Sequence, residues 1–126
     1  MSAESAAGDF QPSRPIDLAQ KKCKPCEGGV APLTRAAAET LLGKVDGGWE
    51  LTADAHSIRR ELAFKDFYRT MSFVNAVAHV ANIEDHHPDL EVGYNYCRIV
   101  FSTHSIGGLS ENDFICAAKV DQIPRV

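Results

Sequence analysis

The sequence predicts one α+β domain, a four-stranded antiparallel sheet with about three helices packed on one face. Two short runs, residues 49–53 and 58–64, are joined by a polar turn, which is typical of a β-hairpin. A second pair of extended runs lies within residues 90–103. Apolar residues recur at helical spacing before, between and after the two pairs. Helices set apart from paired strands in this way indicate an α+β arrangement.

Length and charge narrow the possible functions. The chain has 126 residues, of which 44% are hydrophobic and 24% charged, as expected for one globular domain. A formal net charge of −4 argues against nucleic acid as the main partner, because phosphate binding favours a basic face. Neither an apolar run of membrane-spanning length nor a secretory pattern is visible. We therefore expect a cytoplasmic protein with no nucleic-acid or membrane partner.

The first half of the domain is predicted to be a helix followed by a hairpin. Thr34 can cap the helix, and Asp46-Gly47-Gly48 ends it. A strand over 49–53, a turn at 54–56 and a returning strand over 58–64 follow. The helix is expected to bury Ala37, Leu41, Leu42 and Val45, and one face of the second strand carries Ile58, Leu62 and Phe64.

A long helix capped by Asp66 should come next. It must end near Asp85 or His86, because Pro88 pushes the residue before it out of the helical region. Its apolar residues form two adjacent stripes, a face wide enough for a sheet or a neighbouring subunit. The stripes are Phe67, Met71, Val74, Ala78 and Ala81, and Phe73, Val77 and Val80.

The rest of the chain predicts two strands and a last helix. Residues 93–95 should break the strands, and Gly107-Gly108 forms a loop. Ser110 followed by Asp113 is a capping signal for the last helix. The apolar side of that helix consists of Phe114, Ile115, Ala117, Ala118 and Val120.

Residues 1–32 are predicted to be a flexible extension with a turn-rich connector at Cys23-Lys24-Pro25-Cys26. The two cysteines could be half of a zinc site or a redox pair. No second close pair exists, since Cys97 falls in a strand and Cys116 in a helix, so we interpret the segment as a connector. In a cytosolic protein all four cysteines are expected to be thiols.

Three histidines, His86, His87 and His104, lie within nineteen positions. Imidazole exchanges protons near neutral pH and also binds metals. Adjacent side chains diverge and rarely bind one ion together, so proton transfer is favoured and no metal is expected. His79 is interpreted as a packed or solvent-facing side chain, and Trp49 as a core residue.

A fixed set of spacings supports a more specific interpretation. His86-His87-Pro88, Tyr94, His104 and Asp113 resemble the signature of the pterin-4a-carbinolamine dehydratases. The flanking segments 64–67, 102–104 and 108–110 agree with it. The resemblance runs from about Leu33 to the C-terminus, which places the domain at 33–126.

The resemblance implies dehydration of a 4a-hydroxytetrahydropterin to the quinonoid dihydropterin, with no cofactor and no metal. His86 and His104 would be the acid and base, and His87 would bind and orient the pterin. The substrate-binding set would be Asp85, Pro88, Thr103, Ser105, Ile106 and Asp113, with Asp113 as a supporting carboxylate at the start of the last helix.

The resemblance also implies partners. These are a reduced pterin, an aromatic amino acid hydroxylase that uses the recycled product, and further copies of the chain in a homodimer or homotetramer. The alternative is a non-enzymatic partner protein, such as a RuBisCO assembly factor or a dimerisation cofactor for a transcription factor. One departure is Asn82, where the signature has a charged residue or histidine. Glu84 or Asp85 could compensate for it.

Overall fold

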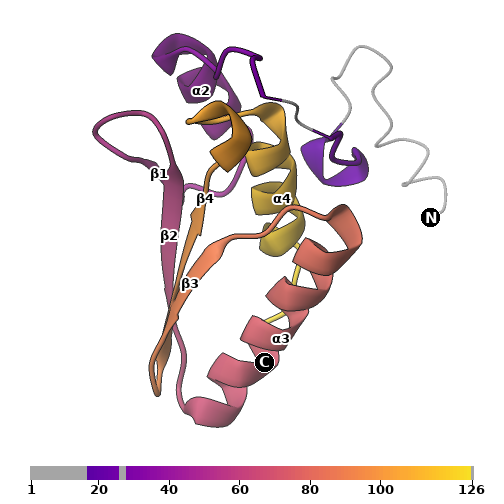
Figure 1. The fold of residues 1–126 in the computed structure, drawn as a ribbon. Helices are drawn as coiled ribbons and strands as arrows, with labels where there is room; N and C mark the ends of the chain where they lie inside the picture. Colours follow the sequence, from indigo (N-terminus) through magenta and orange to yellow (C-terminus); the bar gives the residue numbers. More distant parts are fainter. Residues whose placement is uncertain (1–16, 26–27, 126) are drawn as a thin grey trace, which may run out of the picture.

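The computed structural model describes residues 17–25 and 28–125, and it confirms the predicted α+β arrangement. Four antiparallel strands form one sheet in the order β1-β2-β4-β3, with the longer helices to one side of it (Figure 1). The strands are β1 (Glu50–Leu51), β2 (Ile58–Ala63), β3 (Asp89–Val92) and β4 (Tyr96–Phe101). The edge strand β3 is exposed along its whole length.

Strand β4 shows how the sheet separates its two faces. Cys97, Ile99 and Phe101 are fully buried beneath the helices. On the opposite face Arg98 bonds to Glu61 of β2 and Glu91 of β3, which raises the pKa of its guanidinium further. The strand therefore alternates with the period of two that is typical of β-structure, and its polar face carries ion pairs across three strands.

The helices begin where the capping signals predict. Helix α2 (Arg35–Leu42) is capped by Thr34, and α3 (Phe67–Glu84) by Asp66, each side chain accepting an N–H bond from the first turn. Helix α4 (Glu111–Asp121) begins with a capping box between Ser110 and Asp113. The backbone N–H groups at these helix starts thus receive local partners.

Two elements differ in detail from the prediction. Strand β1 has only two residues, because the turn after it is held by bonds from Thr52 to the Ser57 carbonyl. In α3 the buried face is Thr70, Phe73, Val74, Val77 and Ala81. Phe67 and Ala78 were expected on a buried stripe but are exposed. Part of the wide apolar face, at Phe67 and Ala78, therefore lies outside the core of this single chain.

The core continues to the end of the domain where Trp49 lies. Trp49 is buried as predicted, with its ring 5.9 Å from that of Phe101, and its indole N–H donates to Asp121. Arg60 pairs with the same carboxylate at 2.7 Å. One acidic side chain at the end of α4 thereby satisfies the buried indole N–H and the partly buried guanidinium.

The described part of the N-terminal extension contacts the domain. We call residues 17–25 the strap. It contains a short 3₁₀ turn, η1 (Leu18–Gln20), and Leu18 is buried in the same core as α4. Leu18 therefore connects the strap to the fold, and the expected domain boundary at 32/33 stays a prediction. Residues 1–16 and Cys26, also part of that predicted extension, lie outside the described residues.

Candidate active site

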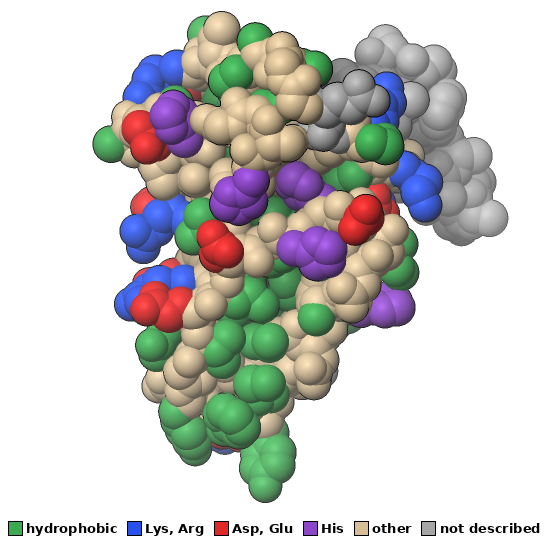
Figure 2. Space-filling view, in the orientation of Figure 1, with side chains coloured by type: hydrophobic (Ala, Val, Ile, Leu, Met, Phe, Trp, Pro, Cys, Tyr) green, Lys and Arg blue, Asp and Glu red, His purple; other side chains and the backbone are tan. Residues whose placement is uncertain are grey.

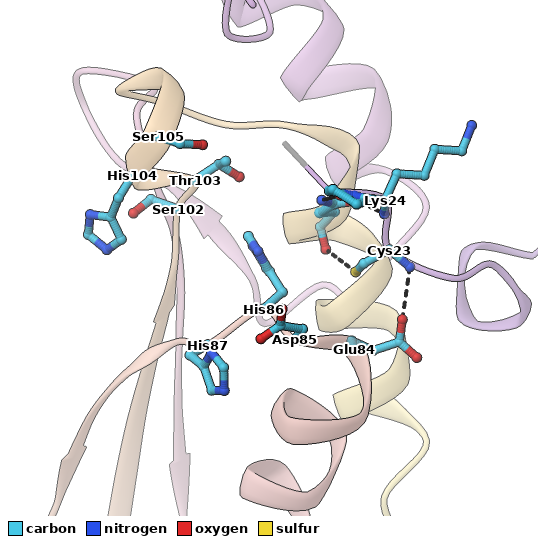
Figure 3. Close-up of a pocket in the computed structure, with 12 residues that line it drawn as sticks. Cys23, Lys24, Glu84, Asp85, His86, His87, Ser102, Thr103, His104 and Ser105 are labelled. Carbon is cyan, nitrogen blue, oxygen red and sulfur yellow. Dashed lines mark hydrogen bonds between the residues drawn. The ribbon is translucent and has the colours of Figure 1, made fainter. Parts of the chain in front are cut away.

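A cavity of about 480 Å³ opens where the end of α3, the end of β4 and the strap meet (Figure 3). This volume falls within the range of small-molecule sites, which is about 300–1,000 Å³. Figure 2 shows the histidines gathered on this face of the molecule, above a band of apolar side chains. The lining residues are Cys23, Lys24, Pro25, Glu84, Asp85, His86, His87, Ser102, Thr103, His104, Ser105 and Asn112.

The end of α3 places His86 and His87. Asp85 adopts the left-handed conformation, with φ 53°, and its N–H and that of His86 both bond to the Ala81 carbonyl. This conformation ends the helix and directs the two rings differently (Figure 3). The predicted end at Asp85 or His86 is confirmed. Pro88 follows, but it does not line the cavity.

A tight turn after β4 places His104. Thr103 and Gly108 form an isolated β-bridge, and the 3₁₀ turn η2 (His104–Ile106) lies between them. Gly107 closes the turn at φ 71°, a conformation that glycine adopts without steric cost. His104 is therefore exposed at the cavity mouth, on a short and well-bonded loop.

Asp113 connects these segments below the cavity floor. Its Oδ1 lies 2.6 Å from Nε2 of His86, and its Oδ2 accepts the Thr103 hydroxyl at 2.8 Å and the Ser110 N–H at 2.9 Å. The carboxylate is fully buried and does not line the cavity. It was expected among the substrate-binding residues, but the structure places it behind His86.

His86 is held on two sides. Its ring stacks on Phe101 at 6.0 Å with 7° between the planes, and only 12% of its side chain is exposed. His87 and His104 are exposed by comparison. The site therefore combines one imidazole of fixed orientation with two that are open to solvent. This pattern suits proton transfer to a bound molecule.

The two acidic residues next to the histidines differ in their surroundings. Burial opposes ionisation of Glu84, but the Cys23 N–H and the charges of Lys119 and Lys22 outweigh it, so the Glu84 pKa is lowered. Asp85 is exposed on the cavity wall. Asn82 is exposed and lies outside the cavity lining. Both residues expected to compensate for it line the cavity, and Asp85 is the more exposed of the two.

Half of the residues that line this cavity were predicted from the sequence. The lining includes the predicted Asp85, His86, His87, Thr103, His104 and Ser105. Ile106 lines a neighbouring hollow with Val30 and Leu109 instead. The strap residues and Asn112 were missed, because no sequence signal connects a segment before α2 with the first turn of α4.

Two other kinds of feature are absent from the described residues. Within 17–25 and 28–125, no group of three or more His, Cys, Asp or Glu side chains is arranged to hold a metal ion. None of the helices in these ranges is long and apolar enough to cross a membrane.

Comparison with known proteins agrees with this geometry. Residues 31–123 match the family model described as pterin 4 alpha carbinolamine dehydratase. The matched region contains α2, all four strands, α3 and α4. The chain therefore belongs to the pterin 4 alpha carbinolamine dehydratase family.

Individual relatives are similar over most of their length. A Nitrosomonas eutropha protein is 63% identical over 107 residues, covering 85% of this chain and 93% of the relative. A Legionella pneumophila protein is 55% identical, covering 85% and 95%. Both bear the name "Putative pterin-4-alpha-carbinolamine dehydratase".

Two solved structures share the fold. A Brucella melitensis protein described as a transcriptional coactivator/pterin dehydratase has 32% identity and a TM-score of 0.67, covering 71% of this chain and 94% of that one. A pterin dehydratase-like protein described as a RuBisCO assembly factor of the alpha-carboxysome has 24% identity and a TM-score of 0.52. It covers 59% of this chain and 86% of its own, and at this identity it shows the fold alone.

Proposed function

We propose that this protein dehydrates a 4a-hydroxytetrahydropterin, releasing water and the quinonoid dihydropterin. The observation that carries the proposal is the convergence of three imidazoles on one cavity, with His86 oriented by a buried carboxylate. Loss of water breaks the bond from C4a to oxygen. An acid must protonate the departing hydroxyl, and a base must take a proton from a ring nitrogen.

The surroundings of the histidines support a division of roles. Asp113 fixes the tautomer of His86 by accepting its Nε2–H, so that Nδ1 can accept or return a proton. His104, on the opposite side of the cavity mouth, serves as the second acid/base group. His87 and the exposed carboxylate of Asp85 bind and orient the pterin, and they are joined by Ser105 and the Thr103 backbone.

The test is the rate of dehydration above the spontaneous reaction, measured for the wild-type protein and for His104→Ala. We expect the wild type to accelerate the reaction and the variant to lose about 10²-fold or more of that acceleration. A wild-type rate equal to the spontaneous rate would exclude the proposed dehydratase activity. It would favour the non-enzymatic partner function instead.

The exposed edge of the sheet supports a further part of the proposal, self-association into a homodimer or homotetramer. Leu90 and Val92 of β3 are exposed, as are Tyr94 and Phe67, whose rings stack at 6.4 Å. An unpaired edge strand beside apolar side chains favours pairing with another copy. We also propose that the product serves an aromatic amino acid hydroxylase. The support for this is family membership.

A further inference from the structure

The strap forms one wall of the cavity. Cys23, Lys24 and Pro25 line it opposite the loop that carries His104 and Ser105 (Figure 3). These three residues precede the region matched by the family model, which begins at residue 31. The wall is therefore supplied by a part of the chain that the family match does not cover.

Asn112 clamps the strap in this position. Its side-chain oxygen accepts the Lys24 N–H at 3.0 Å, and its amide nitrogen donates to the Lys24 carbonyl at 2.6 Å. Asn112 is 6% exposed and is the second residue of α4, one position before Asp113. A buried amide that engages both backbone groups of one residue fixes the direction of the chain there.

Two further contacts are made by strap residues that precede Lys24 in the chain. The Cys23 N–H donates to Glu84 at 2.8 Å, and Glu84 itself lines the cavity. Lys21 pairs with Glu111 at 2.7 Å, and neither of these two residues lines the cavity. Bonds to α3 and α4 together therefore seat the strap across the cavity.

We propose that the strap is part of the substrate-binding site and that Asn112 is the positioning residue that seats it. The inference deepens the proposed function, since the ligand is the same reduced pterin. Lys24 directs its side chain away from the histidines (Figure 3), so this residue contributes its backbone to the wall, beside Cys23 and Pro25. The strap therefore affects pterin binding, while proton transfer depends on the histidines.

The test compares binding of a stable 7,8-dihydropterin by full-length wild type, Asn112→Leu and Lys21→Met. If loss of the clamp leaves the strap seated one tenth of the time, the apparent Kd rises about tenfold. Asn112→Asp keeps the acceptor for the Lys24 N–H and should give a smaller rise. Lys21→Met removes only the partly exposed ion pair with Glu111, which contributes little to seating the strap, so its Kd should stay within about twofold of wild type.

A nearby thiol pair allows the seated strap to be trapped. The sulfur atoms of Cys23 and Cys116 lie 3.5 Å apart, and both cysteines are free. A soluble disulfide reagent would join them by exchange: two protein thiols become one disulfide, and the reagent is reduced to two thiols that take up both protons. The reaction is run with Cys26→Ser to prevent pairing within the connector, and Cys116→Ala serves as the control that cannot form this link.

Trapping the strap with the Cys23–Cys116 disulfide should restore dihydropterin binding to the Asn112→Leu variant. In the Asn112→Leu background, the Cys23–Cys116 disulfide should bring the Kd back to within about twofold of wild type, and reduction should reverse the effect. In steady-state assays the reduced variant should show a raised KM and an unchanged kcat. Loss of folding alone would lower the active fraction and therefore kcat.

Several outcomes would overturn the inference. These are equal Kd values for wild type and Asn112→Leu, or a Cys23–Cys116 disulfide that forms without restoring affinity. Absence of dihydropterin binding by the wild type would also reject it. A wild type that binds dihydropterin but does not accelerate dehydration would refute the proposed function alone, and the Kd comparison would still decide the inference.

Discussion

Replacing Asp113 with Asn tests whether this buried carboxylate controls the chemistry or only the fold. Asn has nearly the same shape, and its carbonyl oxygen can still accept from Thr103 and the Ser110 N–H. Its amide nitrogen then faces Nε2 of His86, where the carboxylate oxygen lies at 2.6 Å. An N–H pointing at Nε2 requires that nitrogen to be the acceptor, so the proton of His86 moves to Nδ1.

Asp113→Asn should have a small effect on the free energy of unfolding and a larger effect on kcat. All three polar contacts retain a partner, and only the charge is lost, so unfolding should become easier by about 1–2 kcal/mol. The proton-accepting nitrogen of His86 is lost altogether. The kcat should therefore fall about 10²-fold or more, which corresponds to about 2.7 kcal/mol in the barrier.

The assay follows the dehydration rate from pH 6 to 9 with thermal melting in parallel, and Thr103→Val is the matched control. That variant removes one bond to Oδ2 but leaves the contact between Asp113 and His86. We expect a similar loss of stability and a kcat within about fivefold of wild type. Equal kcat losses in both variants, or recovery of Asp113→Asn at high pH, would refute the tautomer argument.

The remaining predictions concern charge, thiols and assembly. Asp85→Asn, which tolerates the left-handed backbone, should raise KM more than it lowers kcat if Asp85 compensates for Asn82, and unchanged kinetics would exclude that role. The pKa of Glu84 is lowered in the folded protein, so its ionised form stabilises the fold at pH values above the ordinary glutamate pKa of 4.5. This stabilisation is lost as the pH falls through the pKa of the folded state. The melting temperature should therefore fall more steeply in acid for wild type than for Glu84→Gln. Burial raises the pKa of Cys97 to about 11, so iodoacetamide at pH 8 should modify it only after unfolding, as mass spectrometry would show. Val92→Lys on the exposed edge strand should shift self-association toward monomer in light scattering, and an unchanged mass would place the interface elsewhere.

The fold was predictable where the signal was local. Caps at Thr34, Asp66 and Ser110 start helices through bonds within one turn, and these positions were correct. The buried face of α3 was less predictable. Phe67 is apolar at helical spacing yet exposed, because burial depends on which elements pack there and not on the period alone.

The candidate site also has residues that the sequence predicted and residues that it did not. The order of His86, His87 and His104 along the chain was enough to suggest a shared cavity, because the end of a helix and the end of a strand present them together. The role of Asn112 was not visible, since its partner Lys24 lies 88 positions away and outside any periodic pattern. A clamp between a backbone segment and one buried amide leaves no repeat or motif in a single sequence.

The position of Asp113 explains how a small domain can keep this site rigid. The residue belongs to the capping box of α4, so its orientation is fixed by the same bonds that start the helix. The Thr103 hydroxyl attaches the end of β4 to the same carboxylate, and Nε2 of His86 attaches the end of α3. The orientation of His86 is therefore coupled to the cap of α4 through one carboxylate. Asn112, one position earlier, extends this arrangement to the strap, so the first turn of α4 positions both the fixed imidazole and the cavity wall.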